Sequence, residues 1–173
     1  ATFIDTLRPQ LDNQIGLAGR LRKSGATHVF AAADRPDVAI LARDAAEIGY
    51  PVTISGGEVL RAPSEGVDLA PGTLMVGLPE WADIADPAVV ESFRTKKIEP
   101  EGYVLPAYAG VEIAAQAAKA AAANGSDVLS ALGNQEFSTI FGPVGFDEKG
   151  DRTDNPYRLY RYDGGAFIEV DQQ

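Results

Sequence analysis

The sequence predicts an α/β fold in which a parallel sheet is flanked by helices and followed by a C-terminal β-hairpin. Three observations support this prediction. Short apolar runs alternate with helical patterns as far as residue 78, and this order is typical of right-handed βαβ units. Helical patterns alone occupy the middle of the chain. Near the end, Asp163-Gly164-Gly165 separates two apolar runs, which is a strong hairpin signal.

The first elements alternate in order along the chain. Thr2–Thr6 is expected to form a short strand. Asn13–Ser24 is expected to form a helix, because apolar residues recur on one face and Gly25 follows its end. Thr27–Ala33 is a short apolar run, which is typical of a buried parallel strand.

A second helix and two further strands follow. Asp34 is a good N-cap for a helix that ends at Gly49. Pro51–Ser55 is the next predicted strand. A short helix is expected at Glu58–Arg61, before another apolar strand at Thr73–Leu78.

The pattern changes after Pro79. Helices are expected without intervening strands, at Pro87–Thr95, Pro106–Asn124 and Asp127–Leu132. A strand or turn segment at Phe141–Asp151 then precedes the hairpin strands, Tyr157–Tyr162 and Ala166–Val170. We therefore expect an α/β portion over residues 1–80, a helical portion over 81–140, and a hinge segment with the hairpin over 141–173.

Composition narrows the classes of partner. Hydrophobic residues make up 45% of the 173 residues, so a packed core is expected. A net charge of −10 argues against nucleic acid and anionic lipid, since both require a basic surface. The sequence has no cysteine and no run of about 18 apolar residues, so neither a disulfide nor a membrane span is predicted. The chain opens at Ala1 with no signal-like segment, and we expect a processed or truncated product.

Two carboxylates mark a candidate ligand site. Asp34 follows the predicted strand Thr27–Ala33, and Glu58 follows Pro51–Ser55. In an open parallel sheet, ligands bind outside the carboxyl ends of the strands. If these strands are neighbours, both carboxylates face one crevice and suit an ammonium, amide or guanidinium group. An N-cap role alone also explains Asp34, whereas Gly57 and the glycine before it allow the backbone to approach a ligand near Glu58.

The sequence gives little support to an enzyme. His28 is the only histidine, and it has no cysteine or second histidine with which to hold a metal. No GxSxG or phosphate-loop pattern is present, so no catalytic residue, metal or cofactor is predicted. Trp81 falls where the pattern changes. It is expected either to line a cleft or, in our preferred interpretation, to pack over a hinge.

Four segments resemble one known family over nearly the whole chain. They are LRKSGATHVFAAADRPDVAILARDAAEIGYPVTISGGE, PEGYVLPAYAGVEIAAQAAKAA, GPVGFDEKGD and YRLYRYDGGAFIEV. Together they resemble the C-terminal region of the branched-chain amino-acid-binding proteins, the periplasmic type I solute-binding proteins of ABC transporters. The resemblance implies a type I periplasmic-binding-protein-like, flavodoxin-like α/β fold, incomplete relative to the family. It also implies two lobes that close on a ligand by hinge motion.

The resemblance assigns roles to two residues. In this family the acidic residue after the strand matching Pro51–Ser55 contacts the ligand amino group, and that role maps onto Glu58. The position matching Asp34 often carries an aromatic or polar contact residue. Here Ala31–Ala33 and Asp34 replace the family's bulkier, glycine-containing run. This departure favours a more cationic or amide-bearing ligand, or a site without the usual chemistry.

The function that the resemblance implies is reversible capture of an amino acid, amide or amine in a cleft between the lobes, without chemistry. The implied location is the periplasm, and the implied partner is the membrane permease of an ABC transporter. A sensor ectodomain of the same fold is one alternative. A small flavodoxin-like or receiver-like domain, in which Asp34 and Glu58 imitate a phosphoacceptor cluster, is another.

Length is the main departure from the family, whose members have roughly twice this chain. The helices from about Pro87 to Leu132 are therefore expected to pack on a missing first lobe. Otherwise the alanine-rich helix Pro106–Asn124 exposes an apolar face, and such faces attract partners. We expect the missing N-terminal segment or a second copy of the chain to cover it.

Overall fold

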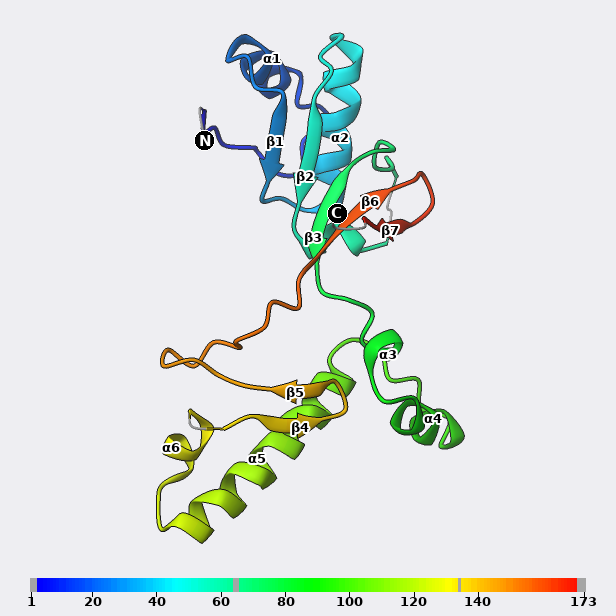
Figure 1. The fold of residues 1–173 in the computed structure, drawn as a ribbon. Coiled ribbons are helices and arrows are strands. Elements are labelled where there is room, and N and C mark those ends of the chain that lie inside the picture. Colours follow the sequence, from blue (N-terminus) through cyan, green and yellow to red (C-terminus); the bar gives the residue numbers. More distant parts are fainter. Residues whose placement is uncertain (1–2, 64–65, 134, 171–173) are drawn as a thin grey trace. The chain divides into compact units, whose positions relative to one another are not determined.

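A mixed sheet of five strands forms the centre of the first of two units into which the chain divides (Figure 1). The computed structural model describes residues 3–63, 66–133 and 135–170. Unit 1 consists of Ala1–Leu78 and Tyr157–Gln173, and unit 2 consists of Pro79–Pro156. The chain therefore leaves unit 1 after Leu78 and returns to it at Tyr157.

The strand order in unit 1 is β1-β2-β3-β6-β7. The first three strands are parallel, which confirms the predicted parallel sheet, and the C-terminal hairpin extends the same sheet in antiparallel register. Each observed parallel strand is shorter than its predicted run. The bounds are β1 His28–Ala31, β2 Thr53–Gly56, β3 Leu74–Gly77, β6 Arg158–Tyr162 and β7 Phe167–Glu169.

One face of this sheet is covered by helices. The helices α1 (Ile15–Lys23) and α2 (Arg35–Glu47) bury their apolar sides in one core with Ala31, Ile54 and Met75. The short 3-10 helix η1 (Glu58–Arg61) adds Leu60, which is fully buried. Residues that alternate with the buried ones point to the other face, where the large apolar side chains of Phe30, Val76 and Ile168 are exposed.

A buried arginine ties distant parts of unit 1 together. Arg35, at the start of α2, donates from Nη1 to the carbonyl oxygen of Leu60 at 2.8 Å. Its Nη2 donates to Oδ1 of Asp68 at 2.6 Å and lies 3.4 Å from the Tyr162 hydroxyl. The guanidinium carbon also lies 5.2 Å from the centre of the Tyr162 ring. The Tyr162 hydroxyl donates to Asp68 Oδ2 at 2.8 Å. We call these three side chains the Arg35 cluster.

The predicted strand Thr2–Thr6 is wrong for the described residues 3–6, which form no regular structure. Among the described strands β1 pairs only with β2. Asp5 instead accepts a hydrogen bond from the Thr6 amide at 2.8 Å and binds Arg20 at 2.6 Å. Such local side-chain bonds compete with a strand ladder. Residue 2 lies outside the described part of the chain.

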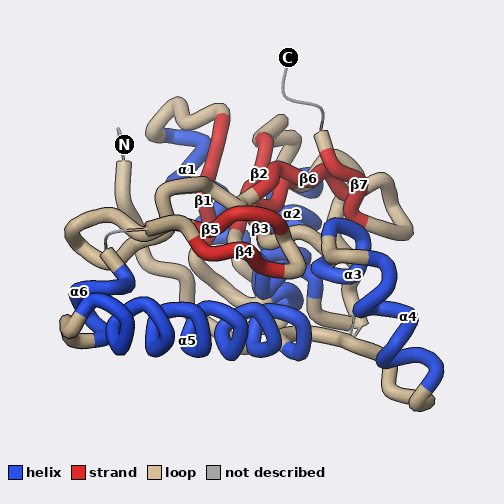
Figure 2. The backbone as a smooth tube through the Cα atoms, turned by 60° about the horizontal axis from the view of Figure 1, so that its bottom comes forward, coloured by secondary structure: helices blue, strands red, loops and turns tan. Residues whose placement is uncertain are grey.

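Unit 2 contains a long helix against a small hairpin. The helix α5 (Val104–Asn124) packs against α6 (Val128–Leu132) and against β4 (Phe137–Thr139), as the tube in Figure 2 shows. Strand β4 pairs antiparallel with β5 (Gly142–Val144). The expected segment Phe141–Asp151 thus contains β5 and Phe146, which forms a β-bridge with Arg152 just beyond it, whereas β4 was not predicted.

Two shorter helices precede α5. They are α3 (Trp81–Ile84), which was not predicted, and α4 (Pro87–Thr95), which has the predicted bounds. Gly125 ends α5 with a left-handed φ of 63°, which favours glycine. None of the helices in the described residues combines the length and apolar character that a membrane span requires.

The alanine-rich helix is covered on one side only. Leu105, Ala109, Ala117 and Ala121 are its buried residues, and the last two pack with Phe137 of β4. A second row recurs at alternating steps of four and three residues along the exposed side. Its members are Val104, Tyr108, Val111, Ala115, Ala118 and Ala122.

Gly56, at the end of β2, is required by close packing. A Cβ atom there would lie 2.8 Å from Leu60 Cδ1 and 3.1 Å from the Ala31 carbonyl oxygen, whereas a Cβ at Gly57 would meet nothing within 4 Å. We expect Gly56→Ala to lower the free energy of unfolding by about 1–3 kcal/mol through overpacking. Gly57→Ala, the matched control, is expected to change it by less than about 0.5 kcal/mol. Urea titrations followed by circular dichroism measure both values, and equal effects would contradict the packing argument.

The Arg35 cluster also predicts a pH dependence. Hydrogen bonds from Tyr162 and then from Arg35 and the Leu69 amide lower the pKa of Asp68, while the bond to Asp68 raises the pKa of Tyr162. A carboxyl whose folded-state pKa lies below its unfolded value, about 4, stabilises the fold above that value. This stabilisation is lost as the pH falls from about 5 through the folded-state pKa. We expect the difference in melting temperature between wild type and Asp68→Asn to shrink over that window. A difference that stays constant from neutral to acidic pH would refute this assignment.

Candidate functional site

The two predicted carboxylates follow strands that are neighbours in the sheet. Strands β1 and β2 pair in parallel, and Ala31 and Gly56 stand opposite each other at their carboxyl ends. Asp34 comes three residues after Ala31, and Glu58 comes two residues after Gly56. The two strands are therefore neighbours, and a crevice shared by both carboxylates stays a prediction.

Asp34 lies at the N-terminus of α2 without acting as a hydrogen-bonding cap. It occupies the N-cap position in an extended conformation, and its side chain makes no cap hydrogen bond. The residue is exposed. The helix-capping explanation for an aspartate at this position therefore lacks its usual bond, and the carboxylate is available to another group.

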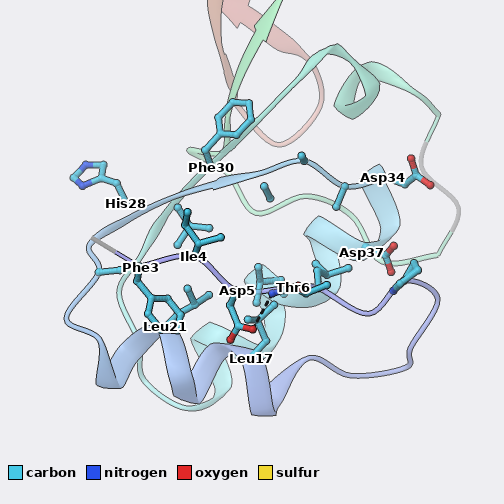
Figure 3. Close-up of a pocket in the computed structure, with 18 residues that line it drawn as sticks. Phe3, Ile4, Asp5, Thr6, Leu17, Leu21, His28, Phe30, Asp34 and Asp37 are labelled. Carbon is cyan, nitrogen blue, oxygen red and sulfur yellow. Dashed lines mark hydrogen bonds between the residues drawn. The ribbon is translucent and has the colours of Figure 1, made fainter. Parts of the chain in front are cut away.

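Asp34 borders a groove of about 720 Å³ along the outer edge of β1 (Figure 3). The groove runs between β1 and the irregular N-terminal segment, and Leu17 and Leu21 of α1 line it. Asp37 of α2 also lines it, and its Oδ1 accepts the Gln10 amide at 2.9 Å. Most lining residues are apolar, Asp34 and Asp37 lie near one end, and Asp5 lies further along (Figure 3). Glu58 is not among the lining residues.

Glu58 is held by the backbone at the end of β3. Helix η1 has three residues per turn, so the side chains of Glu58 and Arg61 project on the same side. Glu58 Oε2 accepts the Leu78 amide at 3.2 Å. Among the described residues, its other oxygen has no hydrogen-bond partner. Within the described part of the chain, the carboxylate therefore has one oxygen bound to the backbone and one oxygen without a hydrogen bond.

The glycines beside Glu58 have different roles. Gly57, the predicted contact residue, has room for a side chain and a φ of −86°, which any residue adopts. The residue that must be glycine because of close packing is its neighbour Gly56. Gly57 thus gives space near Glu58, and nothing in its own conformation demands glycine.

Trp81 belongs to unit 2, where it packs in a small core. Its ring lies 5.0 Å from that of Phe141, at an interplanar angle of 46°. Ala85, Val90, Leu105 and further apolar residues complete this cluster. Trp81 therefore packs against apolar residues of its own unit, as our preferred interpretation expected. A ligand contact by Trp81 stays a prediction.

His28 lies exposed on β1, the edge strand, where its Nδ1 is 2.9 Å from the Thr27 hydroxyl. Within the described residues, no group of three or more histidine, cysteine, aspartate or glutamate side chains is arranged to hold a metal ion.

Two further side chains that bind Leu78, the residue whose amide contacts Glu58, were not predicted from the sequence. Arg61 donates from Nη2 to the Leu78 carbonyl oxygen at 3.0 Å, and Tyr160 donates to the same oxygen at 3.3 Å. The only sequence signal was the spacing of three residues between Glu58 and Arg61. Tyr160 and Tyr162 lie in a predicted hairpin strand, and their contacts with Arg61 and Arg35 depend on tertiary structure.

Comparison with known proteins shows the family. A sequence profile described as "Periplasmic binding protein" matches residues 5–166. The chain is 31% identical over 156 residues to Leu/Ile/Val-binding protein homolog 1 of Brucella abortus, a match that covers 87% of this chain and 42% of that protein. A leucine-, isoleucine-, valine-, threonine- and alanine-binding protein of Pseudomonas aeruginosa is 29% identical, with coverage of 84% and 41%. The chain thus spans less than half the length of these curated relatives.

Solved structures show the same fold. A leucine-binding protein of Thermotoga maritima superposes with a TM-score of 0.65 at 18% identity, covering 95% of this chain and 49% of that one. A substrate-binding protein of an ABC transporter from Desulfitobacterium hafniense, solved with Leu, gives 0.60 at 19% identity, with coverage of 97% and 49%. The chain therefore belongs to the periplasmic binding protein family, and it has the type I fold of the branched-chain amino-acid-binding proteins of ABC transporters.

Proposed function

We propose that this chain is a ligand-binding portion of an ABC-transporter solute-binding protein, which captures an amino acid or a related small amide or amine without chemistry. The proposal depends on the position and contacts of the Glu58 carboxylate. Its carboxylate follows a parallel strand, at the sheet edge where ligands bind in open α/β folds. One oxygen is fixed by the Leu78 amide, and the other has no partner among the described residues.

A fixed carboxylate suits recognition of an ammonium group. Charge-assisted hydrogen bonds are about twice as strong as neutral ones. Affinity also gains when a binding group is held in place before the ligand arrives, because less side-chain freedom is lost on binding. The contact from Leu78 supplies that restriction for Glu58.

Asp34 supports a ligand with more than one polar or cationic group. It follows the neighbouring strand, is exposed and makes no cap hydrogen bond. A second carboxylate at the same sheet edge adds affinity for an amide or a side-chain cation. Gly57 and Trp81 complete the proposed contact set, Gly57 by the space it leaves and Trp81 as an aromatic surface.

Family membership supports the remaining parts of the proposal. The solute-binding relatives bind ligands of several kinds, since solved structures of this fold hold Leu in one protein and benzoate in another. We propose a periplasmic location and a membrane permease as the partner. Capture without covalent chemistry agrees with the names of these relatives, which are binding proteins.

Calorimetry with leucine, glutamine and lysine tests the ligand class. We expect at least one of them to bind, and we expect Glu58→Gln to weaken that binding at least tenfold, because the substitution removes the charge that pairs with the ammonium group. Isocaproate, which is leucine without its amino group, is expected to bind poorly to both proteins. Glu47→Gln on the exposed side of α2 is the matched control and is expected to bind as wild type does.

Binding that is equal in wild type and Glu58→Gln would remove Glu58 from the site. Failure of all three amino acids to bind would refute the proposed function of this chain by itself.

The exposed apolar row of α5 and the open face of the sheet support the expectation that further polypeptide covers this chain. Val111 in unit 2 is 70% exposed and Phe30 in unit 1 is 65% exposed, and exposed apolar patches of this kind mark interaction surfaces. We expect native mass spectrometry to show an assembly of at least two copies of the 18.3 kDa chain. A single copy at every protein concentration would contradict the proposal that a second copy covers these surfaces. The other expected partner, a further segment of a longer protein, would then remain.

A further inference from the structure

Side chains of unit 1 form hydrogen bonds with both the amide and the carbonyl group of Leu78. Glu58 Oε2 accepts the Leu78 amide at 3.2 Å, and the Leu78 carbonyl oxygen accepts from Arg61 at 3.0 Å and from Tyr160 at 3.3 Å. The guanidinium of Arg61 also lies 4.9 Å from the centre of the Tyr160 ring. We call Glu58, Arg61 and Tyr160 the Leu78 clamp.

The clamp lies where the chain passes between its two units. Leu78 is the last residue of unit 1 before Pro79. The neighbouring residue Gly77 pairs with Arg158 across the β3–β6 ladder, and the chain re-enters unit 1 at Tyr157, directly before Arg158. The chain therefore leaves and re-enters unit 1 at the same end of the paired strands β3 and β6. The clamp binds the departing segment at Leu78.

The residues on either side of Leu78, Gly77 and Pro79, influence these contacts. Pro79 has no amide hydrogen and restricts Leu78 to extended conformations, so the Leu78 peptide groups cannot enter a helix. A Cβ at Gly77 would lie 3.2 Å from Met75 Cε, 3.5 Å from Arg61 Nη2 and 3.6 Å from Glu58 Cγ. The distances to Arg61 and Glu58 are ordinary van der Waals contacts, so these two side chains pack directly beside Gly77, and only Met75 would have to shift for a Cβ there.

We propose that Arg61 and Tyr160 are positioning residues for ligand recognition, which act on Glu58 through the Leu78 peptide. By holding the Leu78 carbonyl, they orient the Leu78 amide toward Glu58 Oε2, and this contact fixes the carboxylate with its other oxygen directed to a ligand ammonium. The inference rests on the proposed binding role of Glu58. Because coupling between sites is reciprocal, ligand binding in turn strengthens the hold on Leu78.

The conservative variant Tyr160→Phe tests the clamp in the absence of ligand. It removes one hydroxyl and keeps the ring under Arg61. We expect the hydrogen-exchange rate of the Leu78 amide, measured by NMR, to rise roughly fivefold, which is the effect of losing one neutral hydrogen bond. Tyr103→Phe, which alters an exposed tyrosine of unit 2, is the matched control and leaves that rate unchanged. An unchanged Leu78 rate in Tyr160→Phe would overturn the proposal.

The same variant tests the link to recognition. We expect Tyr160→Phe to weaken binding of leucine, glutamine or lysine severalfold and to lower the preference for leucine over isocaproate, since only the former uses Glu58. A general loss of structure would not change that preference selectively. Faster exchange at Leu78 together with unchanged affinity and preference would refute positioning. If wild type binds none of the three amino acids, the proposed function fails, whereas the exchange experiment still decides whether the clamp exists.

Discussion

The buried guanidinium of Arg35 is the interaction on which unit 1 depends. It lies at the start of α2 and contacts the Leu60 carbonyl, the Asp68 carboxylate and the Tyr162 ring. These partners come from η1, from the loop before β3 and from β6, which are far apart in the sequence. A buried charge is tolerated only when it is paired and hydrogen-bonded. The contacts of this one side chain therefore join the C-terminal hairpin to the first half of the chain, in addition to the β3–β6 ladder.

The Arg35 cluster and the Leu78 clamp act on the same short helix. Arg35 binds the Leu60 carbonyl near the end of η1, while Glu58 and Arg61 of η1 bind Leu78. Two tyrosines that alternate along β6, Tyr160 and Tyr162, each stack on one of the two arginines. Strand β6 thus packs against both arginines that contact η1 or belong to it. The tyrosines involved lie more than a hundred positions after Glu58, whose carboxylate is proposed to bind ligand.

The two units are stabilised in different ways. Unit 1 has a mixed core of aliphatic and aromatic residues beneath a sheet. Unit 2 relies on small residues of α5 that allow β4 and α6 to approach closely, with Phe137 filling the space between them. In both units one apolar surface stays open: the outer row of α5 and the face of the sheet that bears Phe30. This feature agrees with a chain that spans less than half the length of its relatives.

The sequence by itself determined the alternation of strands and helices, the C-terminal hairpin, the positions of Asp34 and Glu58 directly after two strands, and the family resemblance. These properties follow from local periodicity, turn residues and short motifs. Only the tertiary structure decided that Phe3–Thr6 form no strand, that Phe137–Thr139 do, that Arg35 binds Leu60, and that Glu58, Arg61 and Tyr160 all bind Leu78. The physical reason is that strand pairing and the partners of a buried charge depend on segments distant in sequence, so no local pattern records them.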